Sequence, residues 1–452
     1  MDSSRLDMPQ RHEVSTTSRG KQGDEASHSH SLNTLSDEVC IPSADCRKSR
    51  SSWAVERFLL QWLLQALGQA PIAIRLWDGH LISGTGQPTN HEVCIHDRAT
   101  LWKVLLHPDF ELAEGYVAGR IASPSPLTEL LTTHFAAWKQ RKFYRRPARM
   151  TVWRRSWHRT LRRARRNIKH HYDLGNDFYR LWLDEQLLYT CAYFQTPDVG
   201  LEQAQIAKMD HICRKVRLQP GDRVIEAGCG WGAFALHMAR HYGAHVTAYN
   251  ISQEQICYAR QQASAQGLEN QVEFVADDWR NIQGECDVFV SVGMLEHVGP
   301  ENFQELGGVI QRCLSSTGRG LIHSIGLNQP QPLDSWVEQR IFPGAQPPTL
   351  AEAMQLFEPF DFSVLDVENL RLHYALTLRH WLRRFESAAP EIRTMFDESF
   401  VRMWRMYLAA SIASFETGWL QLFQILFAPG TNNALPLTRQ HLDSPGTSIT
   451  TH

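Results

Sequence analysis

The sequence predicts an α/β protein whose main part is a doubly wound, Rossmann-like, mainly parallel sheet. Strand-like and helix-like apolar patterns alternate from residue 219 to residue 326, as expected of parallel strands joined by crossover helices. A glycine-rich turn at 228–232 directly follows one of the apolar strands. Shorter helix and strand patterns at 51–138 predict a smaller α+β domain, and the polar residues 1–50 predict a disordered N-terminal tail.

The expected elements of the main sheet follow in order. Apolar runs bounded by glycine or polar residues predict strands at 223–227, 244–249, 272–276, 286–292 and 319–325. Apolar positions at helical spacing predict helices at 231–242, 252–266 and 301–315. The stretch 395–426 is rich in Trp, Phe, Met and Leu, which predicts long helices that either belong to the core or line an apolar tunnel.

The same patterns divide the rest of the chain. Within the small domain they predict a helix at 55–67, strands at 72–77 and 91–95, and helices at 100–106 and 111–119. The expected organisation is a disordered tail at 1–50, a small N-terminal domain at 51–138, a basic amphipathic linker at 139–169, the main domain at 170–430 and a flexible tail at 431–452.

The basic linker 139–169 contains no aspartate or glutamate. As a helix it would place arginines on one side and four apolar residues on the other: Trp153, Trp157, Leu161 and Ile168. Tryptophan at the headgroup level and arginine on lipid phosphates are typical of a helix on an anionic membrane surface, which is the favoured interpretation. A solvated interdomain helix and a nucleic-acid patch are the alternatives.

Composition limits the possible classes of function. The formal net charge of −2 provides no overall field for polyanions, so contact with them requires a local patch. The nine cysteines include no Cys-x-x-Cys pair and nothing at the N-terminus resembles a signal peptide, which predicts reduced thiols in a cytoplasmic protein. No apolar run reaches membrane-spanning length.

The glycine turn predicts a nucleoside site. Glu226 stands at the exit of a buried strand, and Gly228, Gly230 and Gly232 then let the backbone turn tightly before a helix begins. The spacing differs from the dinucleotide fingerprint and from the phosphate-binding loop. A carboxylate before the turn suits a cationic nucleoside without phosphates, and S-adenosylmethionine is such a ligand. A turn of purely structural glycines is the alternative.

Polar residues after the next strands fit the same ligand. Asn250 ends the second strand, where an acid usually holds ribose hydroxyls, and Gln255 follows at the next helix start. Asp278 and Trp279 close the third strand and offer a carboxylate for an amine and an indole for a purine, although Asp278 equally suits a helix N-cap. At the end of the fourth strand, the pair Glu296–His297 is a candidate for proton transfer.

Five motifs together resemble those of the cyclopropane-fatty-acyl-phospholipid synthases: His171–Asn176, Tyr189–Tyr193, Glu226–Gly232, Glu296–Gly299 and Leu321–Gly326. The resemblance covers roughly residues 55–430, including the small N-terminal domain. It implies that this domain is similar to a lipid-binding domain. It implies a class I methyltransferase domain that moves the methyl carbon of S-adenosylmethionine onto a cis double bond of a phospholipid acyl chain.

Carried over by position, the resemblance implies two groups of site residues and no metal. Bicarbonate, acting as the base, would be held by Cys191, Glu296, His323, the Ile325 backbone and Tyr374. S-adenosylmethionine would be surrounded by Tyr189, Thr190, Glu226, Gly228, Cys229, Gly230, Trp231, Gly232, Asn250, Gln255, Asp278 and Trp279. Without the resemblance, Cys191 is equally well explained as an inert buried thiol or as a site residue, and His323 is better explained as a satisfied core residue.

The implied chemistry is coherent. An alkene is a poor nucleophile, so the sulfonium must be held close and in line. Methyl transfer leaves a carbocation that aromatic faces stabilise, and the base then removes a proton so that the ring closes. Three positions depart from the family's pattern: Ser411 replaces a frequent cysteine, Asn250 a threonine and Phe194 a tryptophan. Asn250 bears on cofactor affinity and Phe194 on the shape of the tunnel.

The leading hypothesis is therefore a cyclopropane synthase of unsaturated phospholipids. It would be cytoplasmic, peripheral to the inner face of the membrane through the basic linker, and a homodimer by family precedent, with no nucleic acid as partner. One alternative keeps methyl transfer but ends in methyl or methylene branching of lipids, or in N-methylation of a small amine. Another is a non-catalytic lipid- or nucleic-acid-binding protein that retains the cofactor fold.

Overall fold

The computed structural model describes residues 51–66, 70–84, 89–140 and 174–443, and all of them belong to one compact unit. The predicted N-terminal tail, nearly all of the basic linker 139–169 and the chain beyond residue 443 lie outside the described residues. The division of the chain into domains therefore stays a prediction.

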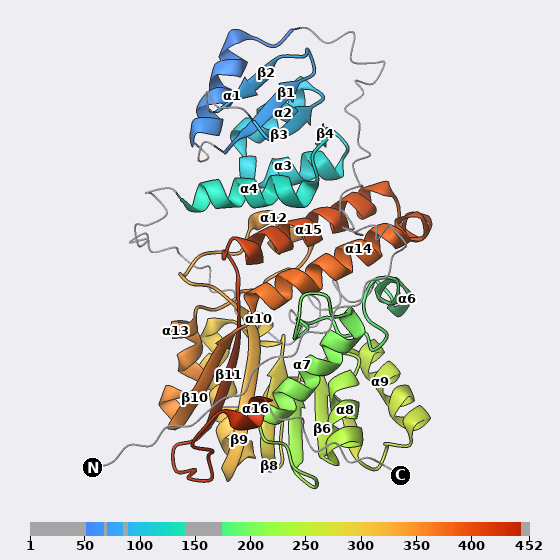
Figure 1. Ribbon diagram of the computed structural model, residues 1–452, viewed down its shortest axis with the longest axis vertical. Coiled ribbons are helices and arrows are strands. Elements are labelled where there is room, and N and C mark those ends of the chain that lie inside the picture. Colours follow the sequence, from blue (N-terminus) through green and yellow to red (C-terminus); the bar gives the residue numbers. More distant parts are fainter. Residues whose placement is uncertain (1–50, 67–69, 85–88, 141–173, 444–452) are drawn as a thin grey trace, which may run out of the picture. The chain divides into compact units, whose positions relative to one another are not determined.

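A four-stranded sheet comes first in the chain (Figure 1). Its order is β2-β1-β3-β4, with β1 and β3 parallel and the two outer pairs antiparallel. The strands are β1 Ile72–Leu76, β2 Leu81–Ser83, β3 His91–Ile95 and β4 Ile121–Ala122. The helices are α1 Ala54–Ala66, α2 Arg98–Leu106, α3 Pro108–Val117 and α4 Leu127–Lys139. The predicted elements of this region are confirmed to within a few residues.

A seven-stranded sheet forms the larger part, in the order β10-β11-β9-β8-β5-β6-β7 (Figure 1). Its strands are β5 Arg223–Ala227, β6 His245–Asn250, β7 Val272–Ala276, β8 Cys286–Val292, β9 Leu314–Gly326, β10 Phe362–Asn369 and β11 Gln421–Pro429. Strands β5 to β9 are parallel, and β11 runs antiparallel to both β9 and β10. The strand order reverses between β5 and β8, and such a switch point opens a ligand crevice at the carboxyl ends of the strands. The predicted doubly wound class is confirmed.

Helices cover both faces of this sheet. Val224 and Val288 pack into one apolar cluster with α7, α8 and α9, whereas their neighbours Ile225 and Phe289 pack into another with α11. Successive side chains of a strand point to opposite faces, so two buried faces require nearly continuous apolar strands. The helices are α6 Asn176–Arg180, α7 Leu201–Lys215, α8 Ala233–Tyr242, α9 Gln253–Gln266, α10 Leu295–Val298, α11 Phe303–Cys313, α12 Ser335–Arg340, α13 Leu350–Ala353 and α16 Gln440–Asp443.

The prediction of long helices at 395–426 is only partly correct. Helices α14 Arg371–Met395 and α15 Glu398–Glu416 form a packed pair, and α15 also contacts α3 and α4. Gly418, with φ 74°, follows the end of α15, and the chain continues as strand β11. A short apolar run does not distinguish a buried strand from a buried helix by its period, and here pairing with β9 and β10 decided for the strand.

The cysteines also depart from the expectation. Six of the described cysteines are free thiols, but Cys94 is disulfide-bonded. The prediction of reduced thiols is wrong at this position, because the absence of a Cys-x-x-Cys pair says nothing about cysteines that are distant in sequence and close in space.

Candidate active site

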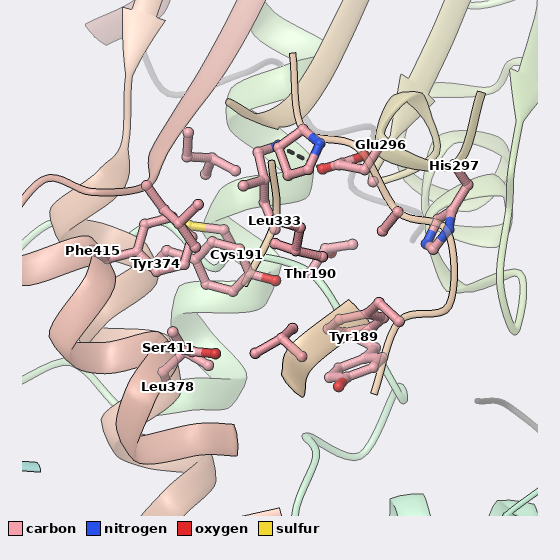
Figure 2. Close-up of a pocket in the computed structure, with 18 of the residues that line it drawn as sticks. Tyr189, Thr190, Cys191, Glu296, His297, Leu333, Tyr374, Leu378, Ser411 and Phe415 are labelled. Atoms are coloured by element: carbon pink, nitrogen blue, oxygen red, sulfur yellow. Dashed lines mark hydrogen bonds between the residues drawn. The ribbon is translucent and has the colours of Figure 1, made fainter. Parts of the chain in front are cut away.

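A cavity with about 840 Å³ of empty space, part of it open to solvent, lies at the carboxyl ends of β8 and β9 (Figure 2). Its walls come from the segment before α7, from α10, from the end of β9 and from α14 and α15. All five residues predicted to hold the base line this cavity: Cys191, Glu296, His323, Ile325 and Tyr374. The fold thus brings together residues that are far apart in sequence, such as Cys191 and Tyr374.

Glu296 occupies the first turn of α10 and is buried. Its Oε1 accepts a hydrogen bond of 2.5 Å from the Ile325 backbone N–H, and its Oε2 is buried without a hydrogen-bond partner. Burial disfavours the charged form and raises the pKa of Glu296 to about 7. Because Oε1 is an acceptor, the protonated acid carries its hydrogen on Oε2. The Ile325 N–H is therefore already engaged, and Ile325 orients Glu296.

His323 lies in β9 opposite Gln424 of β11. Its Nδ1 is 3.1 Å from the Gln424 amide nitrogen, which must donate, so Nδ1 accepts and Nε2 carries the hydrogen. Nε2 is buried without a partner. Burial lowers the pKa of His323 to about 3, which keeps the ring neutral. Sequence reasoning missed Gln424, although a glutamine inside an apolar run was an available signal.

Cys191 and Tyr374 complete this group. The Cys191 Sγ lies 3.2 Å from the Ala192 carbonyl oxygen, and burial raises the pKa of the thiol, which stays protonated. The Tyr374 ring lies 4.6 Å from the Phe415 ring and 5.9 Å from the Trp381 ring, measured between centroids. His297 lines the same cavity, with its ring 6.3 Å from that of Phe342. These side chains add no negative charge to the cavity.

The predicted cofactor loop has the geometry of a nucleoside site. Gly228, Gly230 and Gly232 all have positive φ, at 88°, 55° and 87°. The backbone N–H groups of Gly228 and Cys229 donate to the Tyr249 carbonyl oxygen of β6, at 2.8 and 3.1 Å. This ties the loop to the neighbouring strand, and α8 begins directly after Gly232.

Two buried polar atoms beside this loop have no partner. Glu226 is buried with Oε2 unpartnered, and burial raises its pKa to about 8. The Asn250 amide nitrogen donates to Gln255 Oε1 at 2.7 Å and to the Gly230 carbonyl oxygen at 3.2 Å. These bonds leave Gln255 Nε2 buried and unpartnered. The asparagine that replaces the usual acid thus orients the glutamine, whose amide remains available.

The other predicted cofactor residues have identifiable contacts. Asp278 caps the short helix Trp279–Asn281, accepting from the Arg280 backbone N–H at 3.0 Å, and its Oδ1 pairs with the Arg280 side chain at 3.0 Å. The Arg280 guanidinium lies over the Trp279 ring, 4.3 Å from its centroid. These are the contacts of the N-cap alternative. The Trp231 Nε1–H donates to Asn176 Oδ1 at 2.7 Å.

Tyr189 and Thr190, predicted to contact the cofactor, line the same cavity as the residues predicted to hold the base. The hydroxyl oxygens of Tyr189 and Tyr407 are 2.7 Å apart. Thr190 Oγ1 accepts a hydrogen bond of 2.8 Å from Lys208 Nζ. Sequence reasoning missed Lys208, because a lysine on an amphipathic helix gives no signal of burial.

Besides Asn250, the other two departures from the family's pattern also have a visible place. Ser411 of α15 lines the cavity. The Phe194 ring stacks on His380 with 5.5 Å between centroids.

Across the described ranges, no helix is long and apolar enough to span a membrane, and no group of His, Cys, Asp and Glu there could hold a metal ion.

Comparisons with known proteins identify relatives over most of the chain. A profile of the mycolic acid cyclopropane synthetase family matches residues 159–425. A probable fatty acid methyltransferase of Pseudomonas putida is 34% identical over 392 residues, which cover 84% of this chain and 98% of that protein. The cyclopropane-fatty-acyl-phospholipid synthase of Escherichia coli strain K12 is 39% identical over 272 residues, or 60% of this chain and 70% of that protein.

A solved structure has the same fold. The mycolic acid cyclopropane synthase CmaA1, complexed with SAH and CTAB, superposes with a TM-score of 0.56 and 28% identity, covering 58% of this chain and 97% of that one. The sheet order, the glycine loop and the family match agree. The chain therefore belongs to the mycolic acid cyclopropane synthetase family of S-adenosylmethionine-dependent methyltransferases, with the cyclopropane-fatty-acyl-phospholipid synthases and fatty acid methyltransferases as relatives.

Proposed function

We propose that this chain transfers the methyl carbon of S-adenosylmethionine to a cis double bond of a phospholipid acyl chain and closes a cyclopropane ring with bound bicarbonate as the base. The observation that carries the proposal is the convergence of Cys191, Glu296, His323 and Tyr374 on one cavity (Figure 2). The remaining walls are largely apolar, with Leu, Val, Phe and Ala side chains, and suit an acyl chain.

The residues fit S-adenosylmethionine, which supplies an electrophilic methyl group when bound. The glycine loop exposes backbone at the switch point of the sheet. Glu226 Oε2 and Gln255 Nε2 are buried polar atoms without partners, and a buried polar group of this kind requires an explanation. A cationic ligand with ribose hydroxyls offers both of them hydrogen bonds.

The residues also fit bicarbonate, which supplies a small anionic base when bound. Glu296 and His323 line the cavity, and Glu296 Oε2 and His323 Nε2 are buried without a hydrogen-bond partner. Glu296 in its protonated form can donate from Oε2, neutral His323 can donate from Nε2, and the Cys191 thiol is neutral. Donors without negative charge are what a buried oxyanion requires.

The aromatic walls serve the second half of the reaction. The rings of Tyr374 and Phe415 face the same cavity. An aromatic face stabilises a carbocation by its quadrupole and is not alkylated by it, unlike a carboxylate. Holding the acyl chain in line with the donor methyl group contributes much of the rate, because the alkene is a weak nucleophile.

The direct test is product analysis. Purified protein is incubated with labelled S-adenosylmethionine, bicarbonate and liposomes of a cis-unsaturated phospholipid, and the acyl chains are examined by mass spectrometry and proton NMR. We expect the gain of one methylene unit with loss of the vinyl signal. Unchanged acyl chains in the presence of bound S-adenosylmethionine would contradict the proposal.

Methyl or methylene branching is the second candidate. The relative of Pseudomonas putida, which matches over more of the chain than the relative of Escherichia coli, is named a probable fatty acid methyltransferase. The same experiment separates the two, because a gain of one methylene unit with a retained vinyl signal indicates branching.

Three further assignments belong to the proposal. The basic linker 139–169 would hold the protein at the inner face of the membrane, where the phospholipid substrate lies. The protein would act as a homodimer, and the small N-terminal domain at 51–138 would contact lipid. These rest on the sequence and on the family resemblance.

Because Glu296 is buried without a charged partner, its contribution to the free energy of unfolding should depend on pH. Its pKa rises from 4.5 unfolded to about 7 folded, so the unfolded chain releases this proton first and the contribution to stability is lost between those values as pH rises. We expect the free energy of unfolding of the wild type, minus that of Glu296→Gln, to fall by on the order of 3 kcal/mol from pH 4 to pH 8. Denaturant unfolding of both proteins at each pH measures this difference. A difference in free energy of unfolding that does not change with pH would refute the raised pKa of Glu296.

A further inference from the structure

Lys208 is a buried cation next to the cavity but not on its wall. It lies on α7 with a side chain 2% exposed, and its Nζ donates to Thr190 Oγ1 at 2.8 Å. Thr190 does line the cavity. The Gln205 side chain, one turn earlier on the same helix, donates to the Thr190 carbonyl oxygen at 2.9 Å. Helix α7 therefore holds Thr190 by both its backbone and its hydroxyl.

Two buried acidic side chains, Asp184 and Glu226, interact electrostatically with this lysine. Asp184 accepts from the backbone N–H groups of Gln186 and Leu188, both at 3.0 Å, and thereby holds Leu187 at a left-handed φ of 57°. Glu226 lies on the cofactor side with Oε2 unpartnered. The positive charge of Lys208 opposes the effect of burial on the pKa of both acids. A buried ammonium group needs such partners, because its desolvation is costly.

The hydrogen-bond pattern leaves the Thr190 hydroxyl with a free hydrogen. An ammonium group can only donate, so Thr190 Oγ1 is the acceptor in this contact. The hydroxyl hydrogen is then available to a ligand in the cavity. A donor backed by a buried positive charge favours an anionic acceptor over a neutral one.

We propose that Lys208 is a positioning residue that directs the Thr190 hydroxyl to an oxyanion of a bound ligand, either bicarbonate or the carboxylate of S-adenosylmethionine. This inference rests on the proposed function for the identity of the ligands. Its geometry depends only on the Lys208–Thr190 contact and on the position of Thr190 in the wall.

The test uses Lys208→Met in the full-length protein, with Lys215→Met as the matched control. Lys215 is also buried, lies two turns further on α7, and pairs with Glu368 at 2.6 Å and Asp366 at 3.6 Å. Both variants lose a buried ammonium group from the same helix. The readouts are the dissociation constant of S-adenosylhomocysteine by calorimetry and the bicarbonate concentration for half-maximal turnover.

We expect Lys208→Met to raise one of these two constants about tenfold or more, because a hydrogen bond to a charged group contributes about 1.5–3 kcal/mol. Lys215→Met should leave both within about twofold. A higher dissociation constant for S-adenosylhomocysteine identifies the oxyanion as the cosubstrate carboxylate. A higher bicarbonate concentration for half-maximal turnover identifies it as bicarbonate. Folded Lys208→Met with neither constant raised, or with the same changes as Lys215→Met, overturns the inference.

Thr190→Val and Thr190→Ser provide the same test if Lys208→Met does not fold. Serine keeps the hydroxyl and valine removes it. Only Thr190→Val should therefore raise the dissociation constant of S-adenosylhomocysteine or the bicarbonate concentration for half-maximal turnover. Equal constants in the two variants overturn the inference. Failure of the proposed function is distinguishable, because it leaves the wild type without lipid product, whereas failure of this inference leaves an active wild type.

Discussion

Replacing Glu296 with glutamine is expected to lower the rate of product formation by about 10²-fold or more. Glutamine keeps the size of the side chain and an oxygen that can accept the Ile325 N–H. It replaces the buried carboxyl Oε2 by an amide nitrogen, which can still donate a hydrogen bond but cannot exchange a proton with bicarbonate and so cannot control the protonation of the base. The dissociation constant for S-adenosylhomocysteine, measured by calorimetry, should stay within about twofold, because the cofactor loop is formed by other residues.

A control for this substitution is Glu285→Gln. Glu285 is exposed and pairs with Arg223 at 3.0 Å. It directly precedes the amino end of β8, whereas the cavity lies at the carboxyl end. We expect this variant to turn over at the wild-type rate. Wild-type turnover in Glu296→Gln, or an equal loss in both variants, would refute the role assigned to Glu296.

Replacing Gly232 with alanine is expected to lower the free energy of unfolding by about 3 kcal/mol or more and to abolish binding of S-adenosylhomocysteine. Gly232 has φ 87°, and an added Cβ would lie 2.6 Å from Phe274 Cζ and 2.7 Å from Ala259 Cβ. Both neighbours belong to the packed core, so neither can move without a cost. Denaturant unfolding and calorimetry measure the two effects.

Gly230→Ala is the matched control in the same loop. Gly230 also has a positive φ, 55°, but an added Cβ would have no atom within 4 Å. This variant isolates the backbone cost, which should be about 1 kcal/mol. Equal losses of stability in the two variants would show that packing against Phe274 and Ala259 does not set the requirement for glycine at 232.

The strand–glycine–helix unit from 223 to 242 was predictable because its causes are local. An apolar run, three glycines and a helical period follow one another without a gap, and each has one conformation that suits it. Strand β5 is confirmed at the predicted bounds, and α8 begins two residues later than predicted, after the left-handed Gly232.

Strand β11 shows why part of the candidate site was not predictable. The sequence from Gln421 to Pro429 suits a buried helix as well as a buried strand, and only its neighbours β9 and β10 select the strand. That choice places Gln424 beside His323 and thereby sets which ring nitrogen carries the hydrogen. The residues next to Gln424 in the sequence do not reveal which residue lies opposite it in the sheet.

The doubly wound class, the glycine loop and the residue types that could serve a methyl transfer all follow from the amino-acid sequence. Local propensity and apolar periodicity carry that information. The folded structure was needed to show which of those residues share a cavity, which buried polar atoms lack a hydrogen-bond partner, and that Lys208 is buried and bonded to Thr190. Those properties arise from contacts between distant segments, and burial then sets the charge states of Glu296 and His323.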